Sequence, residues 1–169
     1  MVEDFELVIT RTFDAARELV WRAHTNPECL KEWWGPAGFE RLSMAMDLRP
    51  GGTFLYGLRS PDGAEIWGRF VFREIIPMEI LVYVMSFSDA TGGVTRHPLS
   101  ETWPLELLST VSFEEVNGKT VLTLTSSPIN ATEDERQTFA AGHESMQKGF
   151  GGTYGQLDAF LASSEKGDV

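Results

Sequence analysis

Residues 139–161 read FAAGHESMQKGFGGTYGQLDAFL and indicate a long helix near the end of the chain. The larger side chains recur at spacings of three and four residues, so a helix places them on one face. That face consists of Phe139, His143, Met146, Phe150, Tyr154, Leu157 and Leu161. Upstream, Thr132 and Glu135 have the spacing of a capping box, which marks the start of the helix. Together these signals predict one continuous helix of about 30 residues.

Four glycines interrupt the middle of this helix: Gly149, Gly151, Gly152 and Gly155. Each glycine costs roughly 0.5–1 kcal/mol relative to alanine in a helix interior. Their clustering predicts either a bend or a close approach of the helix to the layer beneath it.

Between residues 42 and 129 the apolar period changes from helical spacing to alternation, which is typical of strands. Turn motifs at residues 50–52, 60–63 and 117–118 separate the segments, and Asn117-Gly118 is the strongest hairpin signal. Residues 65–76 form a long expected strand. The nearly continuous apolar run at 80–87 predicts a strand that is buried on both faces or lies in the centre of the sheet.

The segment before residue 42 combines one expected strand with two short helices. Residues 5–13 are rich in β-branched and aromatic side chains, and Asp14 is expected to cap the helix that follows. Asn26 and Pro27 fit the N-cap and first turn of a second helix, which ends near Trp33 before a Gly-Pro pair. The predicted fold class is therefore α+β, with a curved antiparallel sheet around the terminal helix. We expect a single domain over residues 1–169.

Composition and charge exclude several classes of protein. The chain has 14 basic and 25 acidic residues and a net charge of −11, which argues against nucleic acid and anionic membranes as partners. Its single cysteine, Cys29, excludes an internal disulfide and a cysteine-based zinc site. No basic and apolar leader is visible, and no apolar run approaches the roughly 20 residues that span a bilayer. We expect a cytoplasmic protein.

No catalytic or metal-binding motif is evident. The three histidines, His24, His97 and His143, have no metal-ligand spacing, and nucleotide-binding and nucleophile-elbow motifs are absent from the sequence. His24 is expected to complement the end of the first helix, and His97 is expected to be exposed. His143 is either a hydrogen-bonded core residue or a polar group lining a pocket. We predict no catalytic residue, metal or cofactor.

The chain is rich in aromatic residues, with eleven Phe, five Trp and three Tyr. They either fill the core or line a pocket. Adjacent helical residues point about 100° apart, so one of Trp33 and Trp34 is expected to fill the core and the other to face a cavity. Residues 88–104, with two glycines and two prolines, form either a disordered hairpin tip or a cover for the cavity mouth. The expected ligand-binding residues are Trp34, Phe54, Tyr56, Trp67, Tyr83, Met85, His143, Met146 and Phe150.

Several motifs together resemble one known family. They are FDAARELVWRAHTNPE at 13–28, WWGP at 33–36, DLRPGG at 47–52 and GFGGTYGQL at 149–157. Over about residues 5 to 162, the chain resembles the family named after the activator of the heat-shock-protein-90 ATPase, within the START-like (SRPBCC) superfamily. The resemblance implies a helix-grip fold with a hydrophobic cavity between sheet and terminal helix. Phe150 stands where many relatives have tryptophan, which is expected to change the depth or shape of that cavity.

The resemblance leaves three functions open. The first is binding of a small hydrophobic or amphipathic ligand in the cavity. The second is a cyclase- or hydrolase-type enzyme in which His143 acts as acid or base, although a non-enzyme is the expected outcome. The third is regulation of a chaperone ATPase, with the role in stress response that the family name implies. Family habit also implies a homodimer.

Overall fold

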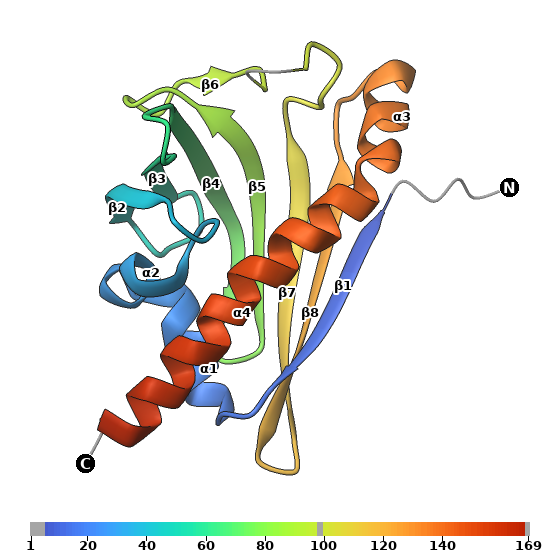
Figure 1. Ribbon diagram of the computed structural model, residues 1–169. Helices are drawn as coiled ribbons and strands as arrows, with labels where there is room; N and C mark the ends of the chain where they lie inside the picture. Colours follow the sequence, from blue (N-terminus) through green and yellow to red (C-terminus); the bar gives the residue numbers. More distant parts are fainter. Residues whose placement is uncertain (1–5, 98–99, 168–169) are drawn as a thin grey trace, which may run out of the picture.

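A long helix lies across the concave face of a curved antiparallel sheet in the computed structural model (Figure 1). The structure describes residues 6–97 and 100–167, and side chains as far as Ser163. The elements are, in chain order, β1 (Leu7–Phe13), α1 (Arg17–Thr25), α2 (Pro27–Trp33), β2 (Glu40–Met46), β3 (Thr53–Arg59), β4 (Glu65–Ile76), β5 (Ile80–Ser88), β6 (Val94–Thr95), β7 (Leu107–Val116), β8 (Lys119–Pro128), α3 (Glu133–Ala141) and α4 (His143–Gly167). This is the predicted α+β helix-grip architecture.

All strand pairs in the sheet are antiparallel, and the strand order is β1-β8-β7-β5-β4-β3-β2, with β6 paired to β5. The order is a meander, except that β1 closes onto the last strand, β8. The predicted hairpin joins β7 to β8, and Asn117 and Gly118 both have positive φ, 52° and 79°, as a two-residue turn of this type needs. The two short helices α1 and α2 lie near one end of α4, and α3 lies near the other (Figure 1).

The core lies between the concave face of the sheet and α4. Alternate residues of β8, Leu122 and Leu124, are buried there, and so are Tyr154 and Leu157 of α4. Burying an aliphatic or aromatic side chain of this size contributes about 1.5–3 kcal/mol. The amphipathic pattern of the terminal helix therefore provides the apolar face that the sheet grips.

The boundaries of α2 agree with its sequence signals, whereas the start of α1 does not. Asn26 caps α2 by accepting a hydrogen bond from the Glu28 backbone N–H at 3.0 Å, and Pro27 is its first residue. The chain turns away after the helix at Gly35, where φ is +98°. The N-cap of α1 is Ala16, which has no side chain able to accept a hydrogen bond. The prediction that Asp14 caps this helix is therefore wrong.

The terminal helix is divided by Gly142 into α3 and α4, so the prediction of one continuous helix is wrong. The capping box of Thr132 and Glu135 is confirmed at the start of α3. The Gly142 backbone N–H is shared among the carbonyls of Thr138, Phe139 and Ala140, and α4 begins at the next residue. A Cβ at this position would lie 3.1 Å from the Trp103 ring, so a glycine allows the indole to pack against the break.

The glycines within α4 do not mark a close approach to the sheet. A Cβ added at Gly149, Gly151, Gly152 or Gly155 would meet nothing within 4 Å. The close-approach interpretation is therefore wrong. Open space surrounds the helix at these four positions, and a Cβ there would not clash with a neighbouring atom.

Two other regions bear on the expectations from the sequence. Strand β5 occupies the centre of the sheet, as predicted, and the residues on both of its faces are buried or half-buried. Part of the 88–104 segment is ordered: β6 pairs with β5, and Asp89 Oδ1 accepts hydrogen bonds from the backbone N–H groups of Thr91 and Gly93 at 2.8 and 2.9 Å. This part of the segment is therefore attached to the end of β5 and is not a structureless tip.

We predict opposite stability effects for alanine at two glycines. Gly152→Ala should raise the free energy of unfolding by roughly 0.5–1 kcal/mol, because alanine favours the helix and its Cβ meets open space. Gly68→Ala in β4 should lower it by about 1–3 kcal/mol, because its Cβ would overlap the Tyr56 hydroxyl that lies over Gly68. Urea unfolding of both variants measures the effects, and a destabilised Gly152→Ala would contradict the packing described.

Candidate functional site

A cavity of about 500 Å³ lies between the sheet and the junction of α3 and α4. It has the size of a small-molecule site, since such sites usually occupy about 300–1,000 Å³. Its wall is built from β3, β5, the start of β7, the segment before β7, the turn after α2 and the first two turns of α4. The lining residues are Pro36, Tyr56, Met85, Ser86, Phe87, His97, Trp103, Pro104, Leu107, Gly142, Ser145, Met146 and Gly149.

A row of aromatic rings forms one side of this cavity. The ring of Phe87 lies 4.8 Å from that of His97, and His97 lies 5.8 Å from Trp103. Trp103 packs in turn on Phe139 of α3, at 5.5 Å. His97 is half-buried in this row, so the prediction that it is exposed is wrong. The row therefore links the end of β5 to α3 through the segment before β7.

Polar contacts hold the segment before β7 against α3. Arg96 forms an ion pair with the largely buried Glu135 and also donates to the Trp103 carbonyl at 3.3 Å. The hydroxyls of Thr102 and Thr138 are 2.8 Å apart. The hydrogen bond from Arg96 is the main reason that the pKa of Glu135 lies below its usual value. These contacts fix the position of Trp103 in the cavity wall.

A second cavity, of about 220 Å³, continues the first one along α4. The two share Pro36, Tyr56, Met146 and Gly149 as lining residues. The remaining wall of the second cavity consists of Trp34, Gly35, Leu58, Phe150 and Thr153. Because Gly149 has no side chain, neither cavity is filled at that point of the helix.

Beneath α4 the aromatic residues pack into a dense cluster with almost no free volume. Phe70 and Tyr83 are stacked, with ring centroids 3.9 Å apart and planes 8° apart. Phe54 lies 5.2 Å from Phe70 and 6.2 Å from Trp34. A space of about 20 Å³ remains, which is enough for one water molecule at most. This cluster is therefore core, and the ligand-sized space lies beside it.

The structure divides the nine predicted ligand-binding residues among several environments. Tyr56, Met85 and Met146 line the main cavity. Trp34 and Phe150 line the second cavity. Phe54 and Tyr83 border only the small space in the aromatic cluster, and so they belong to the core.

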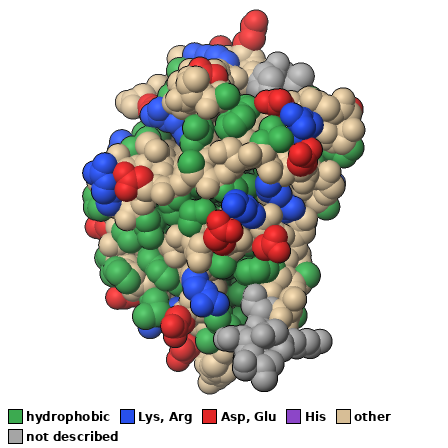
Figure 2. Space-filling view, turned by 90° about the vertical axis from the view of Figure 1, so that its left-hand side faces the viewer, with side chains coloured by type: hydrophobic (Ala, Val, Ile, Leu, Met, Phe, Trp, Pro, Cys, Tyr) green, Lys and Arg blue, Asp and Glu red, His purple; other side chains and the backbone are tan. Residues whose placement is uncertain are grey.

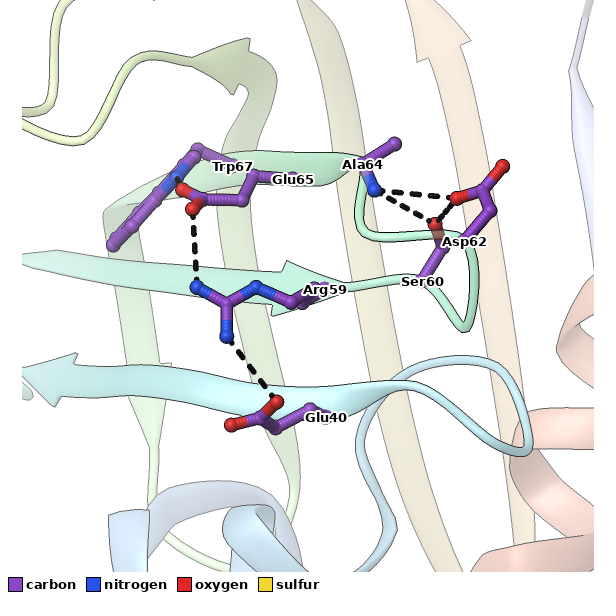
Figure 3. Close-up of polar contacts among 7 residues, drawn as sticks. All are labelled: Glu40, Arg59, Ser60, Asp62, Ala64, Glu65 and Trp67. Carbon is purple, nitrogen blue, oxygen red and sulfur yellow. Dashed lines mark hydrogen bonds and ion pairs between the residues drawn. The ribbon is translucent and has the colours of Figure 1, made fainter.

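Trp67 lies on the outer face of the sheet and lines neither of the two larger cavities. Its indole N–H donates to Glu65 at 3.1 Å, and Glu65 bonds in turn to Arg59 at 3.3 Å (Figure 3). Arg59 also reaches Glu40 of β2, at 3.4 Å. The ring covers Gly57, where a Cβ would overlap it. The expectation that Trp67 faces the ligand space is therefore not supported.

His143 also lies outside the lining of the main cavity. Its ring packs edge-on against Phe139 at 5.1 Å, and its Nε2 is buried with no hydrogen-bond partner in the described part of the chain. An acid or base needs a partner or substrate within hydrogen-bond reach. This position therefore does not support the acid–base role considered for His143.

Sequence reasoning missed the part of the wall that comes from the segment before β7. The glycines and prolines of residues 88–104 indicate a possible cover of the cavity mouth, but none of the expected ligand-binding residues lies in this segment. Ser145 and Gly149 were also missed, because a small residue on a helix gives no apolar signal.

His24 lies in the last turn of α1 and is half-buried against the aromatic cluster. Its Nδ1–H donates to the Val20 carbonyl at 2.8 Å, and its ring packs on Trp33 and Phe113 at 4.9 and 5.1 Å. Burial lowers the pKa of His24 to about 4, which outweighs the stabilising hydrogen bond. The imidazole is therefore neutral at pH 7, and the expectation of a helix-complementing charge is wrong.

Within the described residues, no group of three or more His, Cys, Asp or Glu side chains is arranged to hold a metal ion. No helix within residues 6–97 and 100–167 is long and apolar enough to cross a membrane.

Comparison with protein families matches residues 14–162 to the model described as activator of Hsp90 ATPase homolog 1-like protein. The chain belongs to this family. The match spans most of the chain, from the end of β1 into α4. A comparison with curated proteins finds no significant match.

Solved structures of bacterial proteins share the fold of this family member. A Nitrosomonas europaea protein is 21% identical with a TM-score of 0.77, and the alignment covers 98% of this chain and 99% of that one. An Arthrobacter aurescens protein is 25% identical with a TM-score of 0.75, covering 96% and 90%. A Mycobacterium smegmatis protein is 24% identical with a TM-score of 0.75, covering 93% and 90%. These likenesses confirm the helix-grip fold.

We predict that His24 makes folding stability depend on pH. The pKa of His24 is about 4 in the folded state and 6.5 in the unfolded chain, so the unfolded chain binds the proton first. The free energy of unfolding is therefore unaffected by protonation of His24 above pH 6.5. It falls as the pH decreases toward 4, by about 3 kcal/mol in all. Urea unfolding at pH 7, 5.5 and 4.5 measures this loss. His24→Phe, which cannot titrate, should show a smaller loss than the wild type, and equal losses would contradict the assignment.

Proposed function

We propose that this protein binds a small, largely apolar molecule in the cavity between α4 and the sheet. The observation that carries the proposal is the 500 Å³ cavity lined by Met85, Phe87, Trp103 and Met146. Protein interiors are normally close-packed, and voids larger than a water molecule are few. A space of this size beside a densely packed aromatic cluster is therefore most simply a binding site.

The arrangement of polar groups fits binding better than catalysis. The wall offers mainly aromatic and thioether surface, with the hydroxyls of Tyr56, Ser86 and Ser145 as scattered hydrogen-bonding groups. Such a surface holds an apolar ligand by burial and orients it with few hydrogen bonds. The enzyme and chaperone-regulator alternatives rest on family resemblance alone.

A fluorescent apolar probe, N-phenyl-1-naphthylamine, tests this function. The wild type should bind it with a saturable rise in emission. Gly149→Leu should weaken binding at least tenfold, because the new side chain starts from a bare Cα that lines both cavities.

Gly152→Leu is the matched control. It makes the same substitution in the same helix, at an exposed position that lines neither cavity, and should change the affinity less than twofold. Thermal unfolding establishes that both variants are folded. Absence of binding by the folded wild type, or equal binding by both variants, would contradict the proposal.

A further inference from the structure

The walls of both cavities are uncharged, in a chain that carries 14 basic and 25 acidic residues. Among the described residues, no Asp, Glu, Lys or Arg lines either cavity. Figure 2 shows acidic and basic groups next to one another on one face of the surface. The cavity therefore offers no fixed charge to neutralise an ionised ligand.

The titratable groups in the wall are neutral at pH 7 as well. Burial raises the pKa of Tyr56 above its usual value, so its hydroxyl stays protonated. Burial lowers the pKa of His97 below 6.5, so its imidazole stays mostly uncharged. Neither group supplies a counter-charge near neutral pH.

Transfer of an anionic group from water into such a cavity is energetically unfavourable. An ionised carboxylate or sulfonate loses its hydration and gains neither a partner charge nor a cluster of donors in return. A neutral skeleton of the same shape loses only apolar contact with water, which favours binding. The wall thus distinguishes ligands by charge as well as by shape.

The shape of the space adds a second constraint. The two cavities share Tyr56, Met146 and Gly149, so they form adjoining chambers along α4 and not separate sites. A ligand that fills both is elongated and passes between the Tyr56 ring and the bare face of Gly149.

We propose that the cavity selects uncharged, elongated apolar molecules and excludes anions of the same skeleton, such as fatty-acid-like carboxylates. This inference rests on the proposed binding function and narrows its ligand class. It reduces the broader expectation of a hydrophobic or amphipathic ligand to molecules without an acidic head group.

A pair of dyes that differ only by a sulfonate tests the inference. N-phenyl-1-naphthylamine is neutral, and 8-anilinonaphthalene-1-sulfonate is its anionic counterpart. Titrations in 0.5 M NaCl screen the net charge of −11, because the Debye length there is well below 10 Å. The neutral dye should bind at least tenfold more tightly than the sulfonate. Equal affinities would overturn the charge selection while leaving the binding function intact, and failure of both dyes to bind would overturn the binding function itself.

A cation placed in the wall should reverse the selection. Ser145→Arg puts a guanidinium at the rim of the main cavity, on α4, and should tighten sulfonate binding at least tenfold. Gln147→Arg adds the same charge two residues away, at an exposed position outside the lining, and should leave the ratio of the two affinities within twofold of wild type. An equal gain in both variants would show that surface charge, not the wall, controls anion binding, and would overturn the inference.

Discussion

The attachment of the C-terminal half of α4 to the sheet and to α2 is the constraint on which the rest of the structure depends. Tyr154, Leu157 and Leu161 are almost fully buried there. The Gln156 side-chain amide donates to the Gly35 and Trp33 carbonyls, at 2.5 and 3.3 Å, and so ties the helix to the end of α2. Arg11, on the concave face of β1, donates to Asp158 at 2.5 Å and to the Gly151 carbonyl at 3.4 Å. Apolar burial holds the helix on the sheet, and these bonds fix its position along it.

The N-terminal half of α4 can lie away from the sheet, because the contacts of the C-terminal half already fix the position of the helix. The cavity wall that faces this half of the helix is completed by the segment before β7, which Arg96 and Thr102 attach to α3. The break at Gly142 lets α3 turn toward that segment, and Trp103 then closes the cavity against the break. A helix continuous through residue 142 would lack both the turn and the space for the indole.

Local signals in the sequence predict most of the helices and strands. They do not predict the burial of every side chain or the position of the break between the two terminal helices. The Asn117-Gly118 turn and the Asn26-Pro27 cap depend on a few neighbouring residues, and both were predicted correctly. Strict alternation along β4 places Trp67 on the opposite face from Phe70, so the strand period itself argues against a cavity-facing Trp67. The break at Gly142 and the burial of His24 depend on Trp103 and Phe113, which lie far away in the sequence. Contacts between residues that are far apart in the sequence produce no periodic pattern in it.

The glycines of α4 connect stability with the cavity. Four glycines cost roughly 2–4 kcal/mol relative to alanine in a helix interior, and no neighbouring atom requires any of them. At Gly149 the cost has a counterpart, since a side chain there would enter the space shared by the two chambers. At Gly151, Gly152 and Gly155 nothing in the structure explains it. A chain built only for stability would have alanine at Gly149, so the bare backbone at this position is more consistent with a space kept open for a ligand than with imperfect packing.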